Sequence, residues 1–102
     1  MVVRQDGGGS LVLRRGAARP VRVGTVPVRV ADPRGAGDAF CGGLCVGLAR
    51  TGDPVRAAAY GAVSASFVLE ATDPLALLDV DRRETASRLR QVRDTIVEVA
   101  PA

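Results

Sequence analysis

The chain of 102 residues contains no histidine, no tryptophan and no lysine, and all 14 of its basic residues are arginine. The missing histidine excludes Ser-His-Asp and Cys-His catalysis and histidine-ligated zinc within this polypeptide. The missing lysine excludes Schiff-base chemistry and the phosphate-binding lysine of a P-loop. Any catalysis by this chain must therefore use carboxylate, hydroxyl, thiol, arginine or backbone groups.

Aromatic residues are also scarce, with two Phe and one Tyr. The arginines occur singly or in pairs, so the net charge of +3 does not predict a nucleic-acid-binding face. No apolar run approaches the ~18 residues of a membrane span, and the N-terminus does not resemble a signal peptide. We expect a cytoplasmic protein with no nucleic-acid or membrane partner. Cys41 and Cys45, four residues apart in a predicted helix, are expected to be small buried side chains rather than a metal or redox pair.

The first third of the chain has a β pattern. Val2-Val3 and Leu11-Val12-Leu13 predict two short strands joined by the glycines at 7–9. Between Val21 and Val30, valines alternate with other residues, which predicts a strand pair or one bulged strand. Pro27 places this segment at an edge or a bulge.

The remainder of the chain has helical spacing. A helix is predicted to begin near Asp38 and to run to Arg50, and its glycines predict a buried helix packed closely against another backbone. Asp53 and Pro54 are typical of a helix start, and a second helix is expected over 55–70. A third is expected over 81–99, with Leu89, Val92, Ile96 and Val99 on one stripe. These elements predict an α/β fold in one partial domain, with a small β segment followed by three helices.

The run Gly35-Ala36-Gly37-Asp38 is the one motif with an evident chemistry. Successive N–H groups in a glycine-rich turn that opens a helix point into one concavity, and the helix dipole adds to their positive potential. Gly35, Ala36 and Gly37 therefore form a candidate anion hole. Asp38 is either a capping carboxylate or a base that accepts a proton from an attacking hydroxyl.

The segment from Asp32 to Leu44, read as Asp-Pro-Arg-Gly-Ala-Gly-Asp-Ala-Phe-Cys-Gly-Gly-Leu, resembles the second signature of the ribokinase-like (PfkB) carbohydrate kinases. The resemblance implies that Asp38 is the catalytic base and that the anion hole receives the γ-phosphate of ATP. It covers nearly the whole chain, as the C-terminal, nucleotide-binding part of a three-layer α/β/α fold. Members of this family are longer, so the chain is expected to be a fragment without the sugar-binding residues.

The resemblance also implies a set of ATP contacts. The run 4–9 is similar to the family's Gly-x-x-Gly strand end, although Asp6 stands where the first glycine is usual, and Gly9 matches the second. On the helix expected over 55–70, Ala62 lies near the adenine-lining position. The ATP-binding residues implied in this way are Arg4, Asp6, Gly9 and Ala62.

Asp32 has two interpretations. The resemblance implies that it helps to hold a monovalent cation, K⁺, beneath the anion hole, whereas its position in a turn is equally typical of a plain turn aspartate. Pro33 and Arg34 replace the hydroxyl pair that is usual in the family. ATP and Mg²⁺ are the other cofactors that the resemblance implies.

The function predicted from the sequence is ATP-dependent phosphoryl transfer to a hydroxyl of a sugar or nucleoside, with a homodimer expected for the full-length kinase. Two alternatives use the same residues. One is a nucleotide- or phosphate-binding remnant without turnover. The other is a structural α/β module in which the glycine turn is a packing corner.

Overall fold

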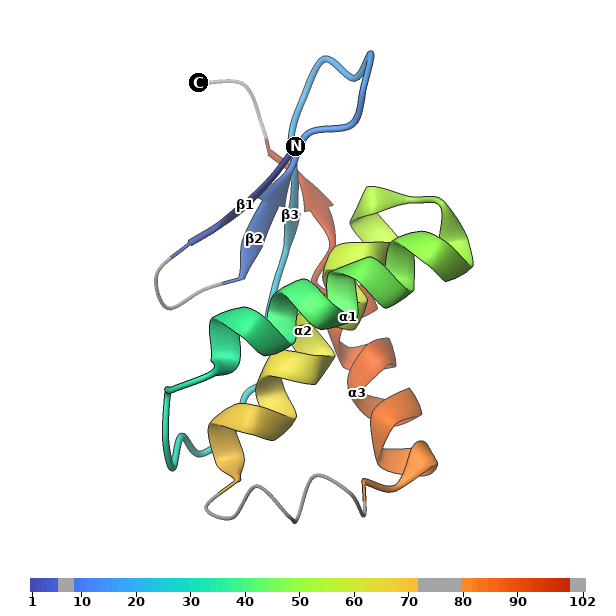
Figure 1. Ribbon diagram of the computed structural model, residues 1–102. Helices are drawn as coiled ribbons and strands as arrows, with labels where there is room; N and C mark the ends of the chain where they lie inside the picture. The colour runs from blue at the N-terminus through green and yellow to red at the C-terminus, as the bar shows by residue number, and fades with distance from the viewer. Residues whose placement is uncertain (6–8, 72–79, 100–102) are drawn as a thin grey trace.

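The structure is a computed structural model that describes residues 1–5, 9–71 and 80–99. In these ranges three short strands precede three helices, and a fourth strand follows them (Figure 1). None of the helices in the described ranges is both long and apolar enough to cross a membrane. The elements are β1 (Val2–Arg4), β2 (Ser10–Val12), β3 (Val21–Val23), α1 (Ala36–Thr51), α2 (Pro54–Glu70), α3 (Arg82–Arg93) and β4 (Val97–Glu98).

The strands form one antiparallel sheet in the order β1-β2-β3-β4. Val12 of β2 lies opposite Val2 of β1 and Val21 of β3. Because side chains alternate across a strand, Val21 and Val23 are buried while Arg22 between them is exposed. The buried valines join the helices in one hydrophobic core.

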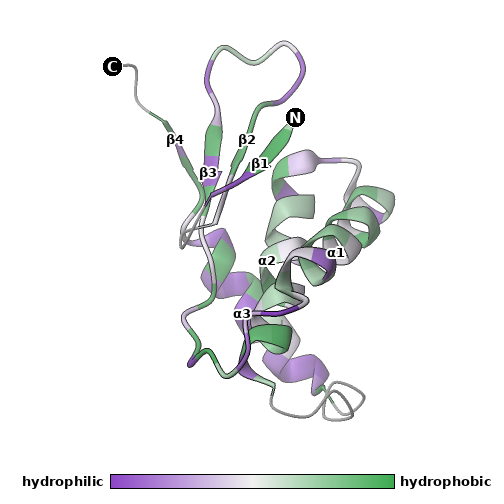
Figure 2. Cartoon of the chain, turned by 60° about the vertical axis from the view of Figure 1, so that its left-hand side comes forward, coloured by the Kyte–Doolittle hydropathy of each residue, from purple (hydrophilic) through white to green (hydrophobic). Residues whose placement is uncertain are grey.

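The central helix is α2, which contacts α1, α3, β2 and β3. Its alanines and small residues are buried over most of its length, and in Figure 1 it crosses behind α1 with α3 beside it. In contrast, hydrophilic residues gather on α3, as Figure 2 shows. The predicted helix over 55–70 is therefore confirmed, and it forms the centre of the core.

Helices α1 and α2 approach closely through glycines. A Cβ atom at Gly43 would lie 2.5 Å from Ser64 Oγ and 2.7 Å from the carbonyl oxygen of Tyr60, and one at Gly47 would lie 2.6 Å from Ala57 Cα. The predicted close backbone approach is confirmed at these two positions. Gly42 differs, because a Cβ atom there would meet nothing within 4 Å.

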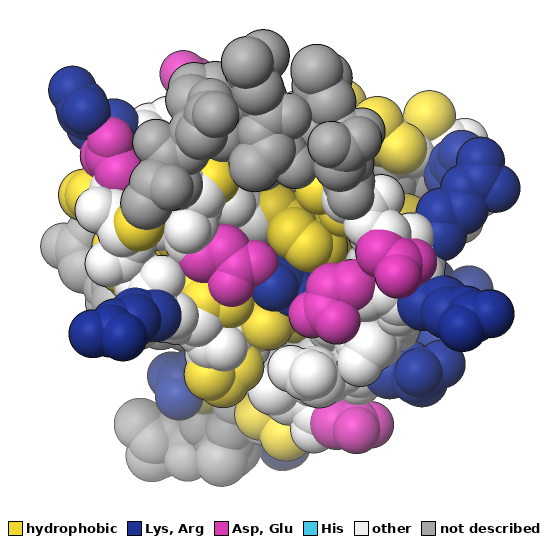
Figure 3. All heavy atoms as spheres, turned by 90° about the horizontal axis from the view of Figure 1, so that it is seen from below, with side chains coloured by type: hydrophobic (Ala, Val, Ile, Leu, Met, Phe, Trp, Pro, Cys, Tyr) yellow, Lys and Arg dark blue, Asp and Glu magenta, His cyan; other side chains and the backbone are white. Residues whose placement is uncertain are grey.

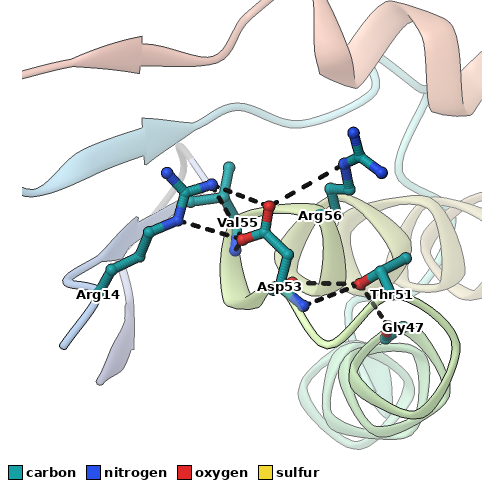
Figure 4. Close-up of polar contacts among 6 residues, drawn as sticks. All are labelled: Arg14, Gly47, Thr51, Asp53, Val55 and Arg56. Atoms are coloured by element: carbon teal, nitrogen blue, oxygen red, sulfur yellow. Dashed lines mark hydrogen bonds and ion pairs between the residues drawn. The ribbon is translucent and has the colours of Figure 1, made fainter.

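The junction between α1 and α2 is held by polar contacts (Figure 4). Gly52 ends α1 with a φ of 66°, and Asp53 caps α2 by accepting from the N–H of Val55 at 3.0 Å, as the sequence predicts. Arg14, from the loop after β2, donates to both carboxylate oxygens of Asp53 at 2.9 Å. Burial acts to raise the pKa of Asp53, but the hydrogen bonds from Arg14 and Val55 and the nearby guanidinium charges outweigh it and lower the pKa.

The third helix is shorter than predicted. It ends at Arg93 instead of Val99, and Val97 and Glu98 form β4, which pairs with β3. Thr95 makes the break, because its Oγ1 accepts from the N–H of Gly24 at 2.8 Å and donates to the carbonyl of Val92 at 2.6 Å. Pairing with the edge of β3 thus makes Val97 and Glu98 a strand, although the spacing of apolar residues in the sequence predicts a helix there.

The sequence interpretation of α1 as a buried helix with buried cysteines is wrong. Cys41 and Cys45 are exposed, as free thiols. Only one face of α1 is buried, comprising Ala36, Phe40, Gly43 and Gly47. The cysteines lie off this face, because the spacing of residues 36, 40, 43 and 47 defines a single helical stripe.

The segment 21–30 contains a single short strand. Only Val21–Val23 pairs, and 24–30 has no regular structure. The strand does not continue, because the N–H of Gly24 donates to the side chain of Thr95 and not to a neighbouring strand. Pro27 has no N–H with which it could pair in a sheet. The predicted α/β class is confirmed as a small antiparallel sheet packed on three helices; the third layer of the predicted fold stays a prediction.

The glycine contact predicts opposite effects at two neighbouring positions. We expect Gly43→Ala to lower the free energy of unfolding by about 1 kcal/mol or more, because overpacking typically costs about 1–3 kcal/mol and backbone atoms of α2 cannot move aside. Gly42→Ala should instead raise it by up to about 1 kcal/mol through helix propensity. Urea unfolding of both variants measures the difference. Equal effects would contradict the close packing of α1 on α2.

Candidate functional site

A pocket of about 500 Å³ lies where the sheet, the segment 25–33 and the two longer helices meet. Its volume is within the range of ordinary small-molecule sites, about 300–1,000 Å³. Most of its lining is apolar, with a few polar groups at one side. The lining residues are Arg4, Gln5, Gly9, Thr25, Val26, Pro27, Val28, Val30, Pro33, Ala36, Gly37, Phe40, Ala62, Ala65, Ser66 and Leu69.

The first turn of α1 opens onto this pocket through Ala36 and Gly37. Gly35 is the N-cap, with a φ of 82°, and no side chain caps the helix. Ala36 N–H donates to the carbonyl of Pro33 at 3.4 Å, and Ala39 N–H donates to that of Gly35 at 3.0 Å. A helix start leaves its next N–H groups without partners inside the helix, so those of Gly37 and Asp38 are oriented to bind a ligand.

Two of the glycines in the site are required for different reasons. Gly35 is in the left-handed region, where an L side chain is strained, although a Cβ atom there would have room at 3.6 Å from Val68. Gly37 has no such φ, but a Cβ atom there would lie 3.1 Å from a guanidinium nitrogen of Arg4. Gly35 therefore shapes the turn that the sequence predicts to be an anion hole, while Gly37 leaves space in front of this turn.

Arg4 places a positive charge beside the anion hole. It is the last residue of β1, and its guanidinium carbon lies 5.0 Å from the ring centroid of Phe40. Stacking on an aromatic ring fixes the guanidinium near Gly37 while leaving its N–H groups available to an anion. Arg4 and the start of α1 thus both favour a negatively charged ligand.

Three of the predicted ATP-binding residues line this one pocket: Arg4, Gly9 and Ala62. Gly9 has a φ of 92°, and a Cβ atom there would clash with the carbonyl oxygen of Val23. Gln5 N–H donates to the carbonyl of Gly9 at 2.9 Å, which brings the start of β2 close to the end of β1. Asp6 lies outside the described residues.

The apolar wall of the pocket comes from α2. Ala62, Ala65, Ser66 and Leu69 follow helical spacing and face the pocket together. Valines of the segment 25–30 lie on the pocket as well. Of these four residues on α2, only Ala62 is predicted from the sequence as part of the site. The lining residues of α2 recur at helical spacing in the sequence, but residues of a hydrophobic core recur at the same spacing. The alternating valines of 25–30 predict only a strand.

Asp38 is exposed in the first turn of α1, next to Gly37. The N-cap is Gly35, so the capping interpretation of Asp38 is wrong. In the part of the chain that the structure describes, its carboxylate has no hydrogen-bonding partner. It is at the surface beside Gly37 and does not line the pocket.

Asp32 lies outside the pocket lining and is paired with Arg34. The backbone N–H of Arg34 donates to Oδ1 at 2.9 Å, and its side chain donates to both carboxylate oxygens, the shortest contact being 2.8 Å. The hydrogen bonds from the Arg34 side chain and backbone lower the pKa of Asp32 to about 2. A monovalent cation at this carboxylate would have to compete with the guanidinium.

Residues 1–5, 9–71 and 80–99 contain no cluster of three or more cysteine, aspartate or glutamate side chains that could hold a metal ion. For the predicted Mg²⁺, these ranges therefore contain no group of three or more such side chains that could bind the ion.

A family model described as pfkB family carbohydrate kinase matches residues 1–79, which is more than half of the chain. The matched range contains the anion hole, Asp38, β1 to β3 and α2, whereas α3 and β4 lie beyond it. No match was found among curated proteins.

The ion pair between Asp32 and Arg34 predicts an unusual titration. In the folded chain the Asp32 carboxyl should titrate near pH 2, and in Arg34→Met its pKa should rise toward the ordinary value of about 3.9 without reaching it, because the backbone N–H of residue 34 still donates to the carboxylate. Because the folded pKa is depressed, the stabilisation is present above about pH 4 and is lost as the pH falls from there toward 2. Carbon-detected NMR titration measures both values, with Arg29→Met as the control. A pKa near 4 in the parent chain would show that the pair does not form in solution.

Proposed function

The chain belongs to the pfkB family of carbohydrate kinases, and on this premise we propose that its pocket binds ATP for phosphoryl transfer to a sugar or nucleoside hydroxyl. The observation that carries the proposal is the meeting of the anion hole, Arg4 and an apolar wall in one pocket. Such a pocket suits a ligand that is flat and apolar at one end and anionic at the other. ATP has this form.

The chemistry of the lining suggests how the nucleotide is oriented. The base packs against the small side chains of α2 at Ala62 and Ala65 and against the valines of 25–30. The phosphates lie at the start of α1, where the N–H groups of Gly37 and Asp38 and the guanidinium of Arg4 donate hydrogen bonds. Ala62 contributes packing only, since it has no polar group.

Asp38 acts as the general base in this proposal. Its carboxylate accepts the proton of the acceptor hydroxyl as the hydroxyl oxygen forms its bond to the γ-phosphorus. The bond from the γ-phosphorus to the bridging oxygen breaks, and ADP leaves. The anion hole stabilises the negative charge of the transferring phosphoryl group, which is the main task of the protein in this reaction.

The cofactors other than ATP have less support in the described residues. Mg²⁺ bound to the nucleotide would neutralise charge on its phosphates. K⁺ at Asp32 requires Arg34 to move away from the carboxylate. We assign no acceptor-binding residue, and the homodimer and cytoplasmic location implied by the family stay predictions.

The anion hole is tested by Gly37→Val. A Cβ atom at Gly37 crowds the Arg4 guanidinium, and losing one hydrogen bond to a charged group, worth about 1.5–3 kcal/mol, lowers ATP affinity at least about tenfold. Adenosine, which has no phosphate, should bind the variant and the parent alike. Calorimetry with both ligands measures this after circular dichroism confirms folding.

Gly42→Val is the matched control for this experiment. It places the same β-branched side chain in the same helix, at an exposed position with nothing within 4 Å. Its ATP affinity should equal that of the parent. An equal ATP affinity for Gly37→Val and the parent would remove the anion-hole assignment.

The general base is tested by Asp38→Asn. Asparagine keeps the size of the side chain but cannot take the proton, so turnover should fall about 10²- to 10⁴-fold with ATP affinity little changed. The measurement needs the polypeptide that joins this chain to the acceptor-binding residues of the family, assayed with a panel of sugars and nucleosides. For the 102-residue chain alone we expect no phosphorylation.

Asp81→Asn is the control substitution. Asp81 caps α3 by accepting from Arg83 N–H at 2.8 Å, and asparagine caps about as well as aspartate. Near-normal turnover in Asp38→Asn would contradict the general-base role. If the longer polypeptide with Asp38 unchanged binds ATP but shows no turnover, the result would favour the nucleotide-binding remnant.

A further inference from the structure

Arg88 on α3 contacts the end of α2 through both terminal nitrogens of its guanidinium, and it contacts its own helix through Nε. Its Nη1 donates to Ser66 Oγ at 3.0 Å and its Nε to Glu84 Oε1 at 2.8 Å, and its Nη2 donates to Glu70 Oε1. The guanidinium carbon also lies 4.0 Å from the ring centroid of Phe67. Arg88 is 7% exposed. Figure 3 shows this end of the molecule, where acidic and basic side chains lie together among hydrophobic ones.

The charge of Arg88 replaces one that α2 does not provide itself. The last turn of α2 contains no basic residue, and its C-cap is Ala71 in an extended conformation rather than a glycine. A cation favours the negative end of a helix dipole, and a helix end without a cap or a cation tends to fray. Arg88 brings a cation from the neighbouring helix to the carboxylate of Glu70, the last residue of α2.

The same end of α2 anchors the segment that leads to the anion hole. The carbonyl oxygen of Leu69 accepts from Ala31 N–H at 2.7 Å and from Asp32 N–H at 3.2 Å. A Cβ atom at Gly35 would lie 3.6 Å from Val68, so the N-cap of α1 also lies near this end of α2. Arg88, the last turns of α2, the segment 31–35 and the anion hole therefore form one contiguous path.

The pocket wall lies on this path too. Ser66, which accepts from Arg88, lines the pocket, and so does Leu69, whose carbonyl anchors the segment 31–35. A displacement of the last turns of α2 would move the wall and the anion hole together. Arg88 itself does not line the pocket.

We propose that Arg88 is a positioning residue, which fixes the end of α2 and through it the place of the anion hole relative to the pocket wall. The alternative is that Arg88 only attaches α3 to α2. The two differ in what fails first when Arg88 is removed: a positioning role loosens the segment 31–35 selectively, whereas simple attachment lowers the stability of the whole chain evenly. The consequence for ATP rests on the proposed function, whereas the coupling to 31–35 does not.

Amide hydrogen exchange in the full chain distinguishes the two roles. In Arg88→Met, which keeps the length of the side chain and removes its charge, exchange at Ala31 and Asp32 should accelerate at least about tenfold. Ala57 N–H is the internal control, because it donates to Asp53 at 2.9 Å at the other end of α2 and reports loss of the whole helix. Its rate should change much less.

Two more substitutions complete the test. Arg88→Lys keeps the charge and should recover part of the protection at Ala31 and Asp32, while Arg90→Met, an exposed arginine on the same helix, should leave all three amides unchanged. If Arg88→Met does not fold, Glu70→Gln removes one ion pair with Arg88 in place and should accelerate the same two amides to a smaller degree. Equal acceleration at Ala31, Asp32 and Ala57, or none at Ala31 and Asp32, would overturn the proposal.

Calorimetry with ATP and with adenosine separates this proposal from the proposed function. If both hold, Arg88→Met should weaken ATP about tenfold and adenosine less, because the phosphates depend on the anion hole. If the parent binds neither ligand while Ala31 and Asp32 still respond to Arg88, the positioning role stands and the nucleotide assignment fails. Unchanged ATP affinity in Arg88→Met, with normal binding by the parent, would overturn the positioning role.

Discussion

The close approach of α1 to α2 is the contact on which the rest of the structure depends. Gly43 and Gly47 lie against backbone atoms of Tyr60, Gly61 and Ala57 and against the side chains of Ser64 and Tyr60, so α1 contributes no side chain of its own to the contact at these two positions. This contact decides where the first turn of α1 falls relative to the wall of α2. A larger residue at either glycine would move the anion hole away from the surface on which the base of a nucleotide would rest.

Local signals in the sequence were sufficient for the elements that depend on local chemistry. The glycine-rich run before Asp38 indicates a turn that opens a helix, Asp53 and Pro54 start a second helix, and small residues in α1 indicate a close helix contact; the structure has each of these features. The glycine turn at the start of α1 was predictable for the same reason, since it is made by three consecutive residues, Gly35, Ala36 and Gly37. Its backbone conformation depends on local chemistry, whereas Arg4 reaches it from β1.

The parts that could not be predicted depend on long-range partners. Val97 and Glu98 have a helical pattern, and only the free edge of β3 makes them a strand. Cysteine is a residue type that is often buried, but no element of the described structure covers the face of α1 on which Cys41 lies. The part of the pocket lining that comes from 25–30 was missed because an alternating valine pattern predicts a paired strand, whether or not a partner is present.

The ion pair between Arg14 and Asp53 has a mechanical consequence. It fastens the sheet to the first turn of α2, whereas the pocket separates the two layers near the last turns of the same helix. Ala62, the first residue of α2 that lines the pocket, follows Asp53 by nine positions, or about 14 Å along the helix axis. The bidentate pair therefore resists separation of the sheet from α2 at the Arg14 side, and a movement that widens the pocket would pivot about this pair.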